Sequence, residues 1–127
     1  MRVLVLVLFG FFGLHAQQII FTKEQKDAIV DRHNYHRRNV NPPASNMQTM
    51  TWSDQAARYA LNLASSCRWG HDNYADRGGM GQNLFITSGK TVSSMTTFVD
   101  SWDKEKRDYI YSSNSCKPGK VCGHYTQ

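Results

Sequence analysis

Three stretches of the chain carry hydrophobic residues at helical spacing. The first follows Thr22-Lys23-Glu24-Gln25, a capping box in which Thr22 accepts a backbone N–H and Gln25 reaches back. It predicts a helix over residues 23–38. Asn41-Pro42-Pro43 ends any continuation, because proline lacks the backbone donor and crowds the preceding turn.

The second stretch has the clearest apolar stripe. Ser53-Asp54 is placed to cap a helix, and Gly70 is expected to end it. The stripe predicts that Cys67 lies on the buried side. Its members are Ala56, Tyr59, Ala60, Leu63, Ala64 and Cys67.

The third helix is expected over residues 92–108, with Glu105 on the same face as Trp102. Short apolar runs at 83–86 and 121–127 have the composition of strands. Three helices and short strands predict an α+β fold or a layered α/β/α domain around a small sheet.

The N-terminus has the pattern of a secretory signal peptide. Arg2 precedes an apolar run of about a dozen residues, and the small residue Ala16 comes before a polar stretch. The run is shorter than the ~20 apolar residues of a membrane-spanning helix. We predict cleavage after Ala16, so residues 1–16 are a signal peptide and the protein is secreted. A buried strand is the alternative for this segment.

Length and composition fit one small globular domain. The chain has 127 residues, of which 40% are hydrophobic and 20% charged, with formal charge +5. The sequence contains no run of Lys and Arg, so nucleic acid is not expected as a partner. The mature chain is expected to have no transmembrane segment, because no second long apolar run follows the first.

Secretion implies an oxidising compartment, where cysteines pair. Cys116 and Cys122 flank a loop of turn residues and are the expected disulfide. If Cys116 and Cys122 pair, the sequence offers no further cysteine as a partner for Cys67. That odd count and the ending at Tyr125-Thr126-Gln127 suggest a fragment.

Three residues are candidates for chemistry, and each has a structural alternative. His71 follows the second helix and is also suited to a surface or helix-terminus role. Glu105 lies on an apolar face, where an unpaired carboxylate is costly, unless it pairs with Lys106 or Arg107 at an edge. His124 lies in a strand-like segment, where a hydrogen-bonded core histidine is the alternative.

Six motifs, in order along the chain, resemble those of the CAP superfamily, which comprises cysteine-rich secretory, antigen 5 and pathogenesis-related-1 proteins. The most specific is Gly123-His124-Tyr125-Thr126-Gln127, similar to the family's G-H-Y-T-Q signature. The others are His33-Asn34-x-x-Arg37, Cys67-x-x-Gly70-His71, Gly81-Gln82-Asn83-Leu84-Phe85 and Trp102-x-x-Glu105-x-x-x-Tyr109, together with Met50-Thr51-Trp52 before the second helix. Within the superfamily, Pro42-x-Ala44-Ser45-x-Met47 and Cys67-x-Trp69-Gly70-His71 are most similar to the vertebrate peptidase inhibitor 16 and glioma-pathogenesis-related group.

The resemblance covers residues 23–127 and implies an α-β-α sandwich with a small central sheet, incomplete at the C-terminus. Residues 17–127 would then form a partial CAP domain. Family members continue with further strands and cysteines, so the resemblance implies a partner for Cys67 beyond this chain.

The resemblance also implies a cleft with two histidines and two acidic residues. The histidines correspond to His71 and His124, which in some members bind zinc or another divalent ion, and imidazole suits such metals. The acidic pair corresponds to Gln82 and Glu105, and Gln82 departs from the family's glutamate. A neutral amide cannot act as a base and attracts a cation less, so any metal is expected to bind weakly.

Three classes of function follow from these observations. The favoured class is a secreted, non-enzymatic protein that binds a lipid or sterol, a protein partner or a protease. The alternative is a metal-dependent hydrolase using His71, His124 and Glu105 around a metal-bound water. The third is binding to heparan sulfate or anionic lipid through Arg32, Arg37 and Arg38 on the first helix.

Overall fold

The computed structural model of the chain describes residues 3–9, 21–88 and 94–127. Its regular elements follow in chain order: β1 Val3–Phe9, α1 Lys23–Arg38, α2 Asp54–Ser65, β2 Gly81–Thr87, α3 Thr97–Asp103, the 3-10 helix η1 Lys104–Asp108, β3 Tyr109–Ile110, the 3-10 helix η2 Tyr111–Ser113, β4 Ser115–Cys116 and α4 Gly123–Thr126.

The bounds of α1 match the prediction, because local signals define both ends. The Thr22 hydroxyl accepts from the Gln25 backbone N–H, and the Gln25 side chain accepts from the Thr22 N–H, so the capping box is complete. Asn39 closes the C-terminus, its N–H donating to the carbonyls of Tyr35 and His36.

The helix α2 begins as expected at Asp54 but ends earlier than predicted, at Ser65 rather than at Gly70. Cys67 has a φ of 52°, a left-handed conformation that breaks the helical periodicity. Its side chain is exposed, so the prediction of a buried Cys67 is wrong.

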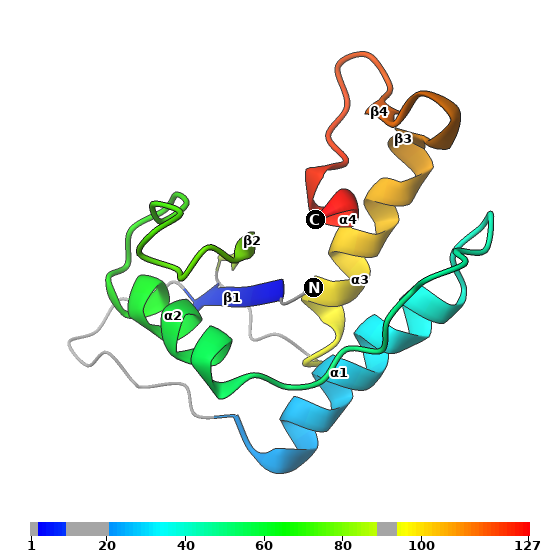
Figure 1. The fold of residues 1–127 in the computed structure, drawn as a ribbon. Coiled ribbons are helices and arrows are strands. Elements are labelled where there is room, and N and C mark those ends of the chain that lie inside the picture. The colour runs from blue at the N-terminus through cyan, green and yellow to red at the C-terminus, as the bar shows by residue number, and fades with distance from the viewer. Residues whose placement is uncertain (1–2, 10–20, 89–93) are drawn as a thin grey trace.

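Neighbouring side chains of β2 divide the core between two layers. Leu84 packs with Ala60 and Leu63 of α2, whereas Phe85 packs with the cluster formed by α1 and α3. Successive strand residues point to opposite faces, so β2 lies between α2 on one side and α1 with α3 on the other (Figure 1). The predicted α+β class and α-β-α layering are confirmed.

The strand β1 falls inside the predicted signal peptide and pairs in parallel with β2, from Val3 opposite Gly81 to Phe9 opposite Thr87. In this 127-residue chain the segment therefore adopts the strand that was its alternative. Cleavage after Ala16 stays a prediction. No helix in the described ranges is both long and apolar enough to cross a membrane.

The third helix is shorter than expected. It is α-helical over Thr97–Asp103 and tightens to η1 over Lys104–Asp108, and residues 92 and 93 lie outside the described part.

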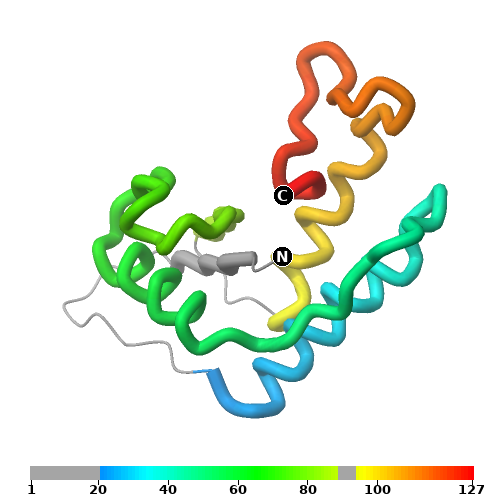
Figure 2. Tube along the Cα trace, in the orientation of Figure 1, coloured from blue at the N-terminus to red at the C-terminus, as the bar shows by residue number. Residues whose placement is uncertain are grey.

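The predicted strand over 121–127 is wrong, since Gly123–Thr126 form the short helix α4. The chain thereby returns to lie beside α3 (Figure 2). A disulfide joins Cys116 to Cys122, with Cα atoms 5.8 Å apart.

Candidate functional site

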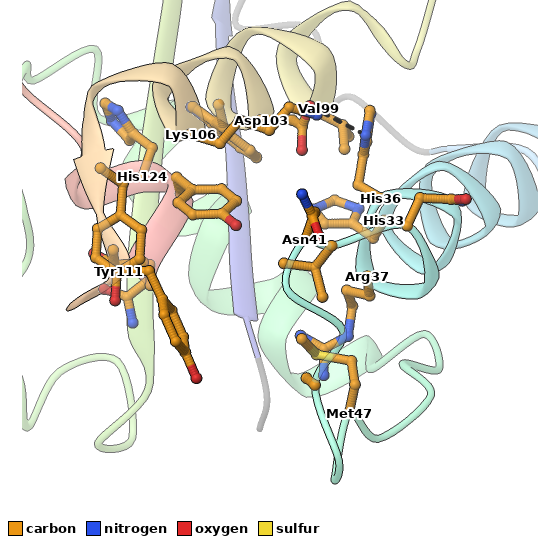
Figure 3. Close-up of a pocket in the computed structure, with 18 of the residues that line it drawn as sticks. His33, His36, Arg37, Asn41, Met47, Val99, Asp103, Lys106, Tyr111 and His124 are labelled. Atoms are coloured by element: carbon orange, nitrogen blue, oxygen red, sulfur yellow. Dashed lines mark hydrogen bonds and ion pairs between the residues drawn. The ribbon is translucent and has the colours of Figure 1, made fainter. Parts of the chain in front are cut away.

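A cavity of about 760 Å³ opens between α1, with the loop that follows it, and the segment from α3 to the C-terminus. His33, His36 and Arg37 project from the α1 side. Asp103 and Lys106 lie along α3 and η1, and His124 lies on the opposite side (Figure 3). Apolar and aromatic side chains make up much of the wall, among them Val40, Met50, Val99, Trp102, Tyr109 and Tyr125.

A chain of ion pairs joins the two helices beside this cavity. Asp100 of α3 pairs with Arg32 at 2.5 Å and with Nε2 of His36 at 2.8 Å. The other ring nitrogen of His36 lies 3.2 Å from Asp103, which also binds Lys106 at 2.7 Å. Burial raises the pKa of the Asp100 carboxyl, but its hydrogen bonds to Arg32 and His36 outweigh burial and lower it.

His33 lies one turn earlier on α1, and its pKa is lowered below the usual value of a histidine. Burial lowers its pKa, opposed only in part by the hydrogen bond to the Ile29 carbonyl, while His36 and Arg37 lower it further. Its Nδ1 lies 2.8 Å from that carbonyl oxygen. Its Nε2 is buried without a hydrogen-bond partner.

His124 is held by the glutamate that the resemblance assigns to the site. Its ring Nδ1 lies 2.7 Å from one oxygen of Glu105, and its backbone N–H donates to the other at 3.0 Å. The ring also stacks on Trp102, with centroids 6.0 Å apart. Glu105 therefore pairs with His124 and not with Lys106 or Arg107, the edge partners considered from the sequence.

His71 forms a separate group with Gln82. Its Nδ1 lies 2.9 Å from the Gln82 amide oxygen, which also accepts the Asp72 backbone N–H at 3.1 Å. The amide nitrogen of Gln82 donates toward the Asp72 carboxylate at 3.4 Å. The site therefore has a carboxylate beside His71 after all, on a residue that sequence reasoning missed although it directly follows that histidine.

The two groups contact different faces of β2. Gln82 shares the face of Leu84, toward α2, whereas Asn83 shares the face of Phe85 and donates to the His124 carbonyl at 2.9 Å. Asn83 and His124 line the cavity, but His71, Gln82 and Glu105 do not. Of the four residues expected in one cleft, the structure joins His71 to Gln82 and Glu105 to His124, and only His124 lines this cavity.

The residues present fit a metal only in part. Gln82 lies against Nδ1 of His71, and Glu105 lies against Nδ1 of His124. Nε2 of each ring is then the nitrogen that could reach an ion, an arrangement common around metal ligands. Within the described residues, however, no three His, Cys, Asp or Glu side chains gather as a ligand group. The donors therefore do not match a three-ligand zinc centre, and a weak ion held by imidazoles stays a prediction.

Sequence reasoning also missed His36 and Asp103. Their signal was present as helical spacing, since Asp100 and Asp103 are three residues apart on α3 and Arg32 and His36 are four apart on α1. Only the crossing of α1 against α3 shows that the two pairs face each other.

Comparison with known proteins agrees with this architecture. Residues 30–127 match the family model "CAP: Cysteine-rich secretory protein family". The chain is 40% identical to mouse (Mus musculus) peptidase inhibitor 16, over 84% of this chain and 21% of that protein. It is 38% identical to mouse peptidase inhibitor R3HDML, over 89% of this chain and 47% of that protein. It is also 38% identical to human (Homo sapiens) cysteine-rich secretory protein 3, over 84% of this chain and 43% of that protein. The chain thus spans less than half the length of these curated relatives. With its layers, its motifs and this match in agreement, the chain belongs to the CAP family of cysteine-rich secretory proteins.

Proposed function

We propose that this protein acts outside the cell by binding, and that the cavity between α1 and α3 takes the apolar part of a lipid or sterol. Membership of a secreted family supports the extracellular setting. The single observation that carries the ligand class is the cavity itself. At about 760 Å³ it falls in the range of small-molecule sites, ~300–1,000 Å³.

The chemistry of the wall supports an amphipathic ligand. Val99 and Trp102 are nearly fully buried and form an apolar floor. Amide side chains also line the cavity, and those of Asn41 and Asn46 belong to exposed residues. An apolar floor together with polar and charged side chains in the wall, among them His36, Arg37 and Asp103, suits a ligand with an apolar body and a polar end.

The same geometry supports binding over hydrolysis. Glu105 would have to be the general base of a hydrolase, but both its oxygens accept from His124. Gln82 is neutral at ordinary pH and cannot replace it. Cleavage of peptides or esters that is abolished by a chelator and by Glu105→Gln would favour the hydrolase instead.

A size-matched pair of variants tests the cavity. Ala44 is exposed and lines it, so Ala44→Trp should fill the opening, whereas Ala75→Trp adds the same ring to an exposed loop outside it. We expect a fluorescent sterol or a fluorescent fatty acid to bind the wild type and the Ala75 variant and to bind Ala44→Trp at least ~10-fold more weakly, about 1.4 kcal/mol. Equal binding by both variants, or none by the wild type, would contradict the proposal.

The names of two relatives suggest peptidase inhibition as the other form of binding. It would be supported if the secreted chain slowed an extracellular peptidase with no lipid bound. The same Ala44→Trp variant separates the two ideas, because an inhibitor acting through another surface would keep its activity.

A further inference from the structure

The net positive charge of this chain is concentrated near its C-terminus. Residues 104–127 contain five Lys and Arg against two acidic residues, a formal charge of +3. Residues 21–103 contain nine against eight, a formal charge of +1. A charge excess confined to one end of a small domain produces a local positive potential, which net charge alone does not reveal.

Four of these five residues lie near one another, on η1 and in the loop between Cys116 and Cys122. Lys104 and Arg107 are three residues apart in η1, and side chains at that spacing in a 3-10 helix lie one above the other. Lys117 is next, since its Nζ donates to the Arg107 carbonyl at 2.6 Å. Lys120 follows in the same turn, its N–H donating to the Lys117 carbonyl at 3.0 Å. We call Lys104, Arg107, Lys117 and Lys120 the basic row.

The basic row is exposed, while the acidic groups near it are largely buried and occupied. All four side chains of the row belong to exposed residues. Asp103 binds His36 and Lys106, and Glu105 binds His124. Asp108 lies 3.5 Å from Arg107 but is only 18% exposed. The row therefore presents cations to solvent with little opposing charge.

The disulfide between Cys116 and Cys122 closes the loop that carries Lys117 and Lys120. This part of the chain projects beyond the end of α3 (Figures 1 and 2). The basic residues of α1 are less available, because Arg32 pairs with Asp100 and Arg37 donates twice to the Gln48 carbonyl. Exposed cations thus gather on η1 and the cysteine loop, whereas Arg38 alone of the three α1 arginines considered from the sequence is an exposed residue.

We propose that the basic row binds a sulfated glycosaminoglycan of the extracellular matrix. A linear polyanion with regularly spaced sulfates matches a row of cations, which form charge-assisted hydrogen bonds with its oxygens. A membrane is disfavoured because an interfacial site needs a broad apolar face, and segment 104–127 has only two large exposed hydrophobic residues, Tyr111 and Val121.

Two triple variants with the same loss of charge test this proposal. The first is Lys104→Gln/Arg107→Gln/Lys120→Gln, which leaves the Lys117 and Lys106 contacts intact. The control is Lys23→Gln/Arg38→Gln/Arg58→Gln, at exposed positions elsewhere. On immobilised heparin, we expect the wild type and the control to elute above about 0.15 M NaCl and the row variant below it. With a heparin oligosaccharide in solution, the row variant should bind at least ~10-fold more weakly and show a smaller dependence on salt.

Circular dichroism and the melting temperature establish that both variants are folded. Equal loss of binding in the control would overturn the proposal, because net charge alone would then explain retention. Absence of wild-type retention at about 0.15 M salt would also overturn it. The proposal would also be overturned if the protein sedimented with phosphatidylcholine–phosphatidylserine vesicles but did not bind heparin, since the surface would then recognise a lipid headgroup. The lipid cavity is tested separately by Ala44→Trp, so either idea can fail alone.

Discussion

The side-chain nitrogen of Gln82 faces a carboxylate oxygen of Asp72 at 3.4 Å, while the oxygen of the same amide accepts from His71. Gln82 is buried, with 3% exposure, and the Asp72 side chain is 15% exposed. The neutral residue in place of the family's glutamate is therefore matched to its surroundings: an amide here can donate to Asp72, and a carboxylate cannot.

Gln82→Glu should destabilise the protein at neutral pH, since it sets a second carboxylate against Asp72. We expect the free energy of unfolding to fall by about 1–2 kcal/mol in urea denaturation. Asp72→Asn in the same chain should recover most of the loss, because the donor and acceptor roles are then exchanged. A Gln82→Glu chain as stable as the wild type would show that the contact contributes nothing.

Asp100→Asn should weaken the contact between α1 and α3. The folded pKa of Asp100 lies below its ordinary value of 3.8, so its contribution is complete above that value and is lost as pH falls through the lowered folded pKa. We expect a destabilisation of about 1 kcal/mol at pH ~6 that shrinks as the pH is lowered below 3.8 toward pH ~2. Denaturant midpoints of the wild type and the variant at both pH values measure it, and a pH-independent difference would contradict the ion-pair explanation.

His33 should make the protein less stable in weak acid. Because burial lowers its folded pKa below 6.5, the unfolded chain binds a proton first as pH falls below that value. We expect the wild type to lose stability relative to His33→Gln over this range, as followed by thermal unfolding. The His36 pairs are present in both chains and serve as an internal control, so parallel pH profiles would show that His33 does not titrate differently on folding.

Zinc should bind weakly and without requiring both histidines. His71 and His124 pair with residues on opposite faces of β2, so single His→Ala variants should each keep part of the calorimetric heat. Complete loss of binding in either single variant would instead mean one shared ion. Identical heats for the wild type and the double variant would remove the metal site altogether.

Secretion predicts that the mature chain begins at Gln17. N-terminal sequencing of protein recovered from culture medium measures this directly. A secreted chain beginning at Met1 would refute cleavage and would keep β1 as the strand beside β2.

The sequence by itself determined the features that depend on near neighbours. The Thr22 capping box and the two prolines after Asn41 define α1, because both signals act within a few residues. Ser53 defines the start of α2 in the same way. The motifs around His71 and His124 identified the family, since each depends only on residue order.

Tertiary structure alone decided how these pieces meet. The left-handed turn at Cys67 ended α2 early. Residues around His124 have strand-forming composition but form a helix, in which His124 contacts Asn83 and Glu105. Folding joined His71 to Gln82 and Glu105 to His124, and the crossing of α1 and α3 placed Asp100 and Asp103 against His36. Apart from the turn at Cys67, these relations join residues 11 or more positions apart, so they depend on the packing of whole layers and not on the local preferences that a sequence displays.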